Sequence, residues 1–599
     1  MSKLIFDIET DGLYEDVTRC WVICIRDIKA GSVERYYDEI LGHGGLPGGD
    51  RVGGIQDGIN RLERAGQIIG HNIIGYDLPV LKKLYGFELP SNVKVTDTLV
   101  LSRLFQPDRS GGHSLAAWGE RLGFPKGDHS DWTQLTSEMI KYCERDVEVT
   151  AKLYDALKKE IRGQKWGESI ELEHDVARII TQQEINGVDF DSDFARATLY
   201  KLRGLVEQID SSLSPLLPVS AERKGTPVSS PFLKTGEVSV RARKLIQNES
   251  AKIIGPFQAV QYKSVDLDSI HQAKEWLLSL GWKASEFTAT GGGKLTEDSF
   301  DSLPDKNLGK LLKERVQCKH RIGQIQGWLD SLRKDGRITA GANTIGTPTG
   351  RMRHNTVVNV PAVGAFMGEE MRAMFRARPG YRFVGHDASG LELRMLAHYM
   401  NDPEYTEVLL NGDIHSHNQK LAGLHTRSSA KTFIYAFIYG AGDFKLGSIV
   451  EGGEDEGAAL RSKFLQENPQ LNKLINKAKR AARERGYLLG LDGRRIWLRR
   501  DERGRVLEHK ALNTLLQCAG AVVMKKSMQL LNQWAVEEGL DFRKVIDMHD
   551  EGQAEVREDH AERYAELAVK SVIEAGKHFN LNVPLDAEAK IGMNWSGTH

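Results

Sequence analysis

An alternation of strand-like and helix-like stretches over residues 1–160 is the feature that most constrains the fold of this chain. The runs KLIFDIE and CWVICIRD are apolar enough for buried strands, whereas TSEMIKYCERDVEVTAKLYDALKKEI has the apolar spacing of an amphipathic helix. Such alternation is typical of an α/β domain. The chain has 599 residues, and it continues with helical patterns at 168–215, 266–281, 305–334, 427–440 and 456–486. Strand signals stand at 381–389 and 544–556. We therefore expect a multidomain α/β protein with several cores.

Composition excludes several classes of protein. Hydrophobic residues make up 40% of the chain and charged residues 27%, which excludes a collagen-like, mucin-like or largely disordered protein. The 81 Lys and Arg residues nearly balance the 82 Asp and Glu residues, so the whole chain is not a basic nucleic-acid coat. A basic groove offset by acidic metal sites is still compatible with this net charge of −1.

Cysteine usage and the first residues of the chain indicate a reducing compartment. The five cysteines include no CxxC pair, which argues against a disulfide framework and against a cysteine zinc site. The start MSKLIFDIETDG becomes acidic too early for a signal peptide. No run of about 18 apolar residues predicts a membrane helix. We expect a cytoplasmic protein with no signal peptide and no membrane partner.

Four carboxylates and a tyrosine occupy three separate motifs near the start of the chain. They are Asp7 and Glu9 at a strand end, Asp77 in NIIGYD, and Tyr142 and Asp146 at i, i+4 spacing on a helix. An acidic pair at a strand end is by itself usually a solvated turn. The complete set predicts hard oxygen ligands for two divalent ions, with the tyrosine orienting a water, as in a two-metal nuclease. An inactivated structural domain is the alternative.

A second acidic pair lies in the last third of the chain. Asp387, in HDASGLELR, ends a strand, and Asp550, in MHDE, lies at the tip of a predicted hairpin within 544–556. Neighbouring strands would let both carboxylates share Mg²⁺. Between them, Arg427, Lys431, Tyr435 and Tyr439 recur every four residues and so line one helix face. A salt-bridged surface is the common reason for such a stripe, but cations followed by aromatic rings also suit a nucleoside triphosphate.

These motifs resemble two known families. The first set is similar to the three motifs of DEDD-type 3′→5′ exonucleases, in their tyrosine variant. DASGLELR, RSSAKTFIYAFIYG and MHDE resemble motifs A, B and C of family A (DNA polymerase I-type) polymerases, above all the replicative polymerases of podovirus bacteriophages. TGR (349–351), NGDIH (411–415) and LNTLLQ (512–517) match in the same order.

The resemblance implies a fold and a division into domains. The fold would be a ribonuclease H-like exonuclease domain beside a right-hand polymerase. The exonuclease would take residues 1–165, the thumb 166–334, the palm 335–405 and 499–599, and the fingers 406–498. The thumb would contain a basic insertion at about 219–262. Its segment 219–256 has seven basic residues (Arg223, Lys224, Lys234, Arg241, Arg243, Lys244, Lys252) and three acidic ones (Glu222, Glu237, Glu249).

The resemblance also implies residue roles and two Mg²⁺ ions per active site, with Mn²⁺ as a substitute. Asp7, Glu9, Asp77 and Asp146 would bind the exonuclease metals. Asp387, Asp550 and the Ala388 carbonyl would bind the polymerase metals, with a lesser role for Glu551. The triphosphate would contact His415, Arg427 and Lys431, and Tyr439 would also contact the nucleotide. Glu392 with Tyr435 would exclude a 2′-hydroxyl, and Tyr435 would favour acceptance of dideoxynucleotides. DNA contacts would come from Arg321, Arg351, Asn359, Gln517 and His549.

We expect template-directed DNA synthesis with proofreading, for replication of a phage genome in the host cytoplasm. Primer–template DNA and deoxynucleoside triphosphates would be the partners, and a helicase–primase is a candidate. NTVVNVP (355–361) departs from the PNLQNIP of many relatives, and no large 5′-nuclease domain is expected. Host thioredoxin is not expected as a partner. The basic insertion could instead contact DNA phosphates, bind another protein or be only a solvated loop. Alternatives are a nuclease with a DNA-gripping body, a non-catalytic scaffold and a ribonucleotide polymerase.

Overall fold

The amino-terminal pattern forms a six-stranded mixed sheet, which confirms the α/β prediction. Strand β1 (Lys3–Thr10) runs antiparallel to β2 (Cys20–Asp27) and parallel to β5 (Gln67–Gly70) in the order β4-β3-β2-β1-β5-β6. Helix α5 (Ser137–Glu160), capped by Thr136, packs on β1 and β2. The other elements here are β3 (Val33–Tyr36), β4 (Arg51–Gly53), α1 (Ile55–Glu63), α2 (Asp77–Tyr85), β6 (Lys94–Asp97), α3 (Thr98–Phe105) and α4 (Leu115–Arg121).

A second, antiparallel sheet joins segments that are far apart in the sequence. Its strand order is β17 (Phe542–Met548), β18 (Glu551–Arg557), β14 (Tyr381–Ala388) and β19 (Ala587–Gly592). These strands confirm the ones predicted at 381–389 and 544–556. Helices α19 (Ala511–Glu537) and α20 (Ala561–His578) pack on each other, and α20 also covers β14 and β19. The core of the molecule thus consists of separate clusters around each sheet.

Helices and one short pair of strands occupy the stretch between β14 and α19. The helix predicted at 427–440 is α15 (Arg427–Ile438), whose Phe433 and Phe437 pack edge-on against Phe464. The helical pattern at 456–486 forms two helices, because Pro469 starts a new one. The elements are α12 (Leu391–Met400), α13 (Pro403–Asn411), α14 (Ile414–Ala422), α16 (Asp443–Gly447), α17 (Glu454–Glu467), α18 (Pro469–Arg485), β15 (Tyr487–Leu489) and β16 (Arg495–Trp497).

The helical pattern at 168–215 is interrupted by a short strand. Helix α6 (Gly167–Asn186) ends at Gly187, whose φ of 57° favours glycine, and β7 (Val188–Phe190) precedes α7 (Ser192–Leu213). Strand β7 lies between β10 (Arg337–Ile338) and β13 (Phe375–Arg376). A further pair consists of β11 (Ala342–Asn343) and β12 (Arg353–His354).

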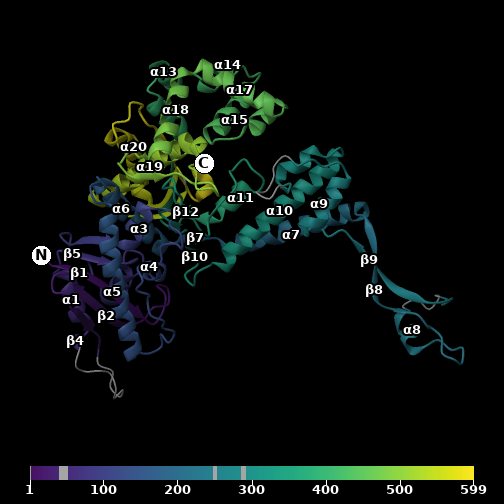
Figure 1. Cartoon of the computed structure of the whole chain (residues 1–599), viewed down its shortest axis with the longest axis horizontal. Coiled ribbons are helices and arrows are strands. Elements are labelled where there is room, and N and C mark those ends of the chain that lie inside the picture. Colours follow the sequence, from purple (N-terminus) through teal and green to yellow (C-terminus); the bar gives the residue numbers. More distant parts are fainter. Residues whose placement is uncertain (1, 39–50, 247–251, 285–291, 549) are drawn as a thin grey trace. The chain divides into compact units, whose positions relative to one another are not determined.

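The predicted basic insertion contains a two-stranded hairpin. Strands β8 (Val219–Val228) and β9 (Phe257–Ser264) pair antiparallel and are largely exposed, as expected of an insertion, although no strands were predicted there. Figure 1 shows this hairpin continuing from the bundle of α7, α9 (Ile270–Ser279) and α10 (Lys306–Asp330). Helix α8 (Val240–Leu245) lies between these two strands in the sequence. Trp276, Trp282 and Phe300 belong to the core of this bundle.

The computed structural model describes residues 2–38, 51–246, 252–284, 292–548 and 550–599, except for the side chain of residue 298. By its contacts the chain divides into two units. Unit 1 comprises Met1–Phe190, Ser331–Val360 and Arg372–His599, and unit 2 comprises Asp191–Asp330 and Pro361–Met371. Helix α11 (Gly368–Ala373) crosses the boundary. The finer domain boundaries stay a prediction. In the described residues, no helix combines the length and apolarity that crossing a bilayer requires.

Candidate functional site

Three elements bring together the four carboxylates of the amino-terminal set. Asp7 and Glu9 lie on the same face of β1, Asp77 begins α2, and Asp146 lies on α5. Glu9, Asp77 and Asp146 are 7%, 4% and 3% exposed, so this is a buried acidic cluster. One oxygen each of Glu9 (Oε1), Asp77 (Oδ1) and Asp146 (Oδ1) has no hydrogen-bond partner among the described residues. Buried oxygens of this kind fit divalent cations.

Burial and mutual repulsion perturb these carboxyl groups. Burial and then the charge of Asp146 raise the pKa of Glu9 to about 9. The pKa of Asp77 rises to about 7, mainly through burial. The pKa of Asp7 lies well above its ordinary value because of burial and then the neighbouring Glu9. Full ionisation of the cluster would therefore create an excess of negative charge, which bound cations would offset.

Lys126 is a member of this site that the motif analysis missed. Its Nζ lies 2.6 Å from Asp146 Oδ2 and 4.5 Å from the centre of the Tyr142 ring. Although burial lowers the pKa of Lys126, the Asp146 carboxylate raises it above its ordinary value. Trp132 also packs edge-on against Tyr142. A single lysine in a loop has no distinctive spacing, so only the fold reveals it.

The antiparallel sheet brings Asp387 and Asp550 together. Asp387 lies near the end of β14, opposite Glu551 on β18, and Ala388 N donates to Asp550 O at 3.2 Å. Although the Asp387 side chain is exposed, the surrounding protein raises the pKa of its carboxyl to about 7, and Asp550 and Glu551 add to this effect. The two carboxylates could share a cation only if their strands were neighbours, and the pairing of β14 with β18 meets that condition.

Glu551 faces the carboxyl terminus. Its Oε1 accepts hydrogen bonds from Gln553 Nε2 at 2.7 Å, from His599 Nε2 at 2.8 Å and from Trp595 Nε1. Arg372 Nη1 lies 3.6 Å from the same oxygen. Burial alone would raise the pKa of Glu551, but these contacts, His599 first, lower it. The partners from the last five residues were not assigned a role by the sequence analysis.

The predicted triphosphate-binding stripe lies along α15. Arg427 and Lys431 are both exposed, and Arg427 Nε pairs with Asp413 Oδ2 at 2.7 Å. The His415 ring lies 6.2 Å from the Tyr435 ring, and His415 Nδ1 has no hydrogen-bond partner in the described part of the chain. Burial, followed by Arg427 and Lys431, lowers the pKa of His415. The stripe thus offers two cations to an anion, and the imidazole of His415 on α14 lies close to it.

Glu392 links three of the motifs. Tyr439 Oη donates to Glu392 Oε1 at 2.8 Å, and Arg351 Nη2 is 3.7 Å from the same oxygen. The sequence analysis paired Glu392 with Tyr435, and in the structure the hydroxyl contact comes from Tyr439. Tyr435 is half-buried close by, and Glu392 contributes to its raised pKa after burial.

A buried ionic network lies behind Arg351. Lys525 Nζ, on α19, donates to Glu173 Oε1 at 2.7 Å, to Glu173 Oε2 at 2.9 Å and to Gly350 O at 2.8 Å. Arg494 Nη1 donates to Glu173 Oε1 at 2.6 Å, and its other nitrogens bind Asp492. These four side chains are at most 3% exposed. None of them was predicted, because the residues come from distant segments.

The predicted DNA contacts come from separate segments of the chain. Gln517 is half-buried on α19, and Asn359 is exposed with a φ of 51°. Arg321 belongs to unit 2, where its Nε donates to Phe366 O at 3.4 Å. His549 lies outside the described residues. Their roles stay predictions.

Comparisons with known proteins identify relatives of the whole chain. The sequence profile of DNA polymerase family A matches residues 237–597. The DNA-directed DNA polymerase of Escherichia phage T7 is 31% identical, with all of both chains covered. That of Escherichia phage Phieco32 is 33% identical over 71% of this chain and 98% of its own. The POL domain of Pol1 from M. smegmatis, solved with DNA primer-template and dNTP, has a similar fold. Its TM-score is 0.77 at 19% identity, with 99% of this chain and 96% of that chain covered. The chain belongs to family A of the DNA polymerases.

Proposed function

We propose that this DNA-directed DNA polymerase uses Asp387 and Asp550 as its polymerising centre and the cluster around Asp7 as a proofreading 3′→5′ exonuclease. Template-directed DNA synthesis is the activity of the family. The juxtaposition of Asp387 and Asp550 across β14 and β18 carries the polymerase assignment. The domain roles proposed for the chain follow the boundaries predicted above, with unit 2 containing most of the thumb.

At the polymerising centre, Asp387 and Asp550 would hold two divalent ions, Mg²⁺ by preference, with help from the Ala388 carbonyl. The ions would supply Lewis-acid stabilisation of charge on the α-phosphate. Arg427 and Lys431 would neutralise the triphosphate, Arg427 exchanging Asp413 for phosphate oxygens. The primer 3′-hydroxyl would attack the α-phosphate, and pyrophosphate would leave.

The Glu392–Tyr439 contact favours a role in sugar selection. A hydrogen bond to a carboxylate is strong and directional, so Tyr439 would hold Glu392 in one position. Glu392 packed beside the half-buried Tyr435 ring would then exclude a 2′-hydroxyl. Arg351 would reach the primer or template from the other side of Glu392, and Gln517, Asn359, Arg321 and His549 would make the remaining DNA contacts.

At the exonuclease centre, the four carboxylates would hold two divalent ions that supply Lewis-acid activation of a water and of the leaving oxygen. Tyr142 would orient the water. Lys126 would keep Asp146 and Tyr142 in place through its 2.6 Å ion pair and its contact with the ring. The unpartnered oxygens of Glu9, Asp77 and Asp146 support this assignment.

The cellular setting is also a proposal. The similarity to phage polymerases supports replication of a phage genome in the host cytoplasm, with primer–template DNA and deoxynucleotides as partners and a helicase–primase as a further candidate. The exposed β8–β9 hairpin is available to DNA or to another partner.

Primer extension on a long primed single-stranded circle tests the assignment of the two centres. Wild-type protein with Mg²⁺ and deoxynucleotides should lengthen the primer, and without deoxynucleotides it should shorten it. Asp550→Asn should abolish extension and keep shortening, and Asp7→Asn should do the reverse. Loss of both activities in either variant would contradict two independent centres, and unchanged extension by Asp550→Asn would overturn the polymerising centre.

A further inference from the structure

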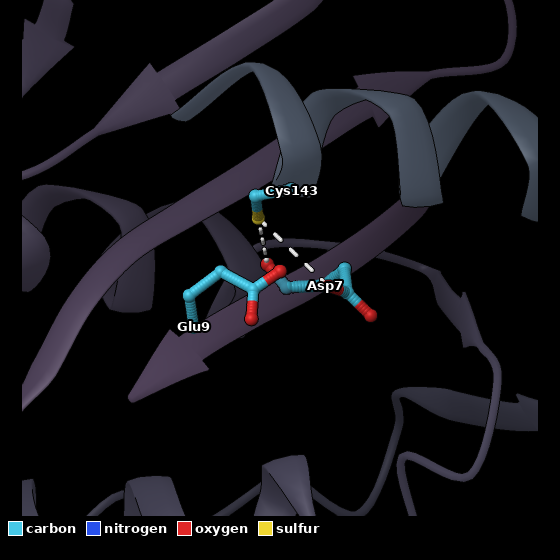
Figure 2. Close-up of side chains that lie close together, drawn as sticks. All are labelled: Asp7, Glu9 and Cys143. Carbon is cyan, nitrogen blue, oxygen red and sulfur yellow. Dashed lines mark hydrogen bonds between the residues drawn. The ribbon is translucent and has the colours of Figure 1, made fainter. Parts of the chain in front are cut away.

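A buried thiol lies inside the amino-terminal carboxylate cluster. Cys143 Sγ is 3.9 Å from Asp7 Oδ2, and ligand atoms of Asp7, Glu9 and Cys143 all lie within 4.8 Å of one another. Figure 2 shows the Cys143 side chain extending from α5 toward the strand with both carboxylates. The thiol also donates weakly to Asp7 O at 3.4 Å.

The arrangement follows from the periods of the two elements. Asp7 and Glu9 share one face of β1, and Cys143 is three residues before Asp146 on α5, so both pairs face the same space. Cys24 on β2 is directly opposite Asp7 in the register, and it too is fully buried. Cys24 is absent from the three-residue group. The cluster therefore contains one thiol in ligand position and a second thiol nearby.

A cation-binding role is supported by a second observation at the same place. Glu9 is only 7% exposed, yet its Oε1 has no hydrogen-bond partner among the described residues. A tetrahedral Zn²⁺ with one sulfur ligand at about 2.3 Å and one oxygen ligand at about 2.1 Å holds those two atoms about 3.6 Å apart. The observed Sγ–Oδ2 distance of 3.9 Å is close to this requirement.

We propose that Cys143, with Asp7 and Glu9, forms a mixed thiolate–carboxylate site for a thiophilic divalent cation such as Zn²⁺, and that this ion inhibits the exonuclease. On binding, a metal–sulfur bond forms and the thiol proton passes to solvent, with no change of oxidation state. A soft thiolate prefers Zn²⁺ or Cd²⁺ to Mg²⁺. The inhibitory part rests on the exonuclease function proposed above.

The polymerising centre differs in its ligands. We consider groups of three or more His, Cys, Asp or Glu side chains whose ligand atoms lie close enough to hold a metal ion. Among the described residues, the group of Asp7, Glu9 and Cys143 is the one that includes a cysteine. Asp387 and Asp550 offer oxygen alone. A thiophilic ion should therefore suppress exonuclease activity at concentrations that leave DNA synthesis intact.

Binding of Cd²⁺ to the metal-free full chain tests the site directly. A thiolate bound to Cd²⁺ produces an ultraviolet charge-transfer band, which reports the sulfur ligand without any enzyme assay. The band should appear for the wild type and for the matched control Cys24→Ser, and it should be lost in Cys143→Ser and weakened in Asp7→Asn. A band that persists in Cys143→Ser, or one that is absent from the wild type, would overturn the site. Cys143→Ala serves if the serine variant does not fold.

Inhibition by Zn²⁺ tests the consequence. At constant Mg²⁺, exonuclease activity on single-stranded DNA should be half-inhibited at a Zn²⁺ concentration about tenfold or more below that for primer extension, and Cys143→Ser should remove this difference. Equal sensitivity of wild type and Cys143→Ser would overturn the inhibitory role. A wild type with no exonuclease activity in Mg²⁺ alone would instead overturn the proposed proofreading, and the Cd²⁺ band would still decide whether the metal site exists.

Discussion

At the residue scale, the hydroxyl of Tyr439 and the imidazole of His174 make hydrogen bonds that the sequence motifs did not predict. Tyr439 is an exposed residue at the end of a helix, yet its hydroxyl holds the carboxylate of Glu392 at 2.8 Å. His174 is 4% exposed, and its two ring nitrogens form hydrogen bonds with the backbone of Asp97 and of Ile170. Each of these contacts leads to a testable prediction.

Tyr439→Phe should weaken discrimination against ribonucleotides. A hydrogen bond to a charged group is worth about 1.5–3 kcal/mol, so its loss should lower the ratio of kcat/KM for deoxynucleotides over ribonucleotides about tenfold or more. Single-nucleotide incorporation kinetics measure the ratio. Tyr435→Phe is the matched control, because it keeps the ring and does not remove the Glu392 hydrogen bond. Equal ratios in wild type and Tyr439→Phe would contradict the role of this contact.

His174 should make the fold sensitive to acid. Its Nε2 accepts from Asp97 N at 2.8 Å, and its Nδ1 donates to Ile170 O at 2.8 Å, so only the neutral ring fits. Burial lowers its pKa below the value of 6.5 for a free side chain. The unfolded chain therefore binds more protons, and stability is lost as the pH falls below about 6.5.

His174→Asn removes this titration, so its unfolding free energy should depend less on pH between pH 7 and the folded pKa. The difference between wild type and variant should approach about 1.4 kcal/mol per pH unit. Urea unfolding at several pH values measures it. Parallel pH profiles for the two proteins would show that His174 is not the responsible group.

At the scale of elements, α6, α19 and the loop before β16 are joined by the buried network of Glu173, Arg494 and Lys525. Lys525 Nζ donates hydrogen bonds to both carboxylate oxygens of Glu173 and to the carbonyl oxygen of Gly350. Arg351 follows directly and reaches Glu392. The network thus fixes the turn that precedes Arg351.

Lys525→Met should destabilise the protein by about 3–5 kcal/mol, because it leaves buried charge uncompensated. Urea unfolding measures the loss. Lys526→Met is the matched control, since Lys526 is only half-buried and donates to Gln529 Oε1 at 2.9 Å, and it should cost less than about 1 kcal/mol. The double variant Glu173→Gln with Lys525→Met should be less destabilised than the sum of the single changes. Additive losses would argue against the coupling.

At the scale of the whole molecule, carboxylates lie close together in two acidic centres, and metal binding would offset their mutual repulsion. Glu9 and Asp387 have raised pKa values because of burial and neighbouring carboxylates. Function and stability therefore oppose each other at these sites in the absence of metal.

Mn²⁺ should raise the thermal midpoint of the metal-free wild type by several degrees, because it binds the folded state alone. The double variant Glu9→Gln with Asp387→Asn should have a higher midpoint than the wild type in EDTA and a smaller response to Mn²⁺. Scanning calorimetry with and without Mn²⁺ measures both effects. Equal Mn²⁺ shifts in the two proteins would contradict cation binding at these carboxylates.

The sequence by itself determined the local features of this polymerase. Short apolar runs identified β1, β14, β17 and β18, and a four-residue spacing identified the face of α15, because such patterns depend only on near neighbours. Motif spacing also placed the carboxylates at strand ends. The tertiary structure decided the rest: Lys126 beside Asp146, Lys525 beneath Gly350, His599 on Glu551 and Cys143 against Asp7. These partners come from segments far apart in the chain, and a contact that depends on packing between distant elements leaves no local period to read.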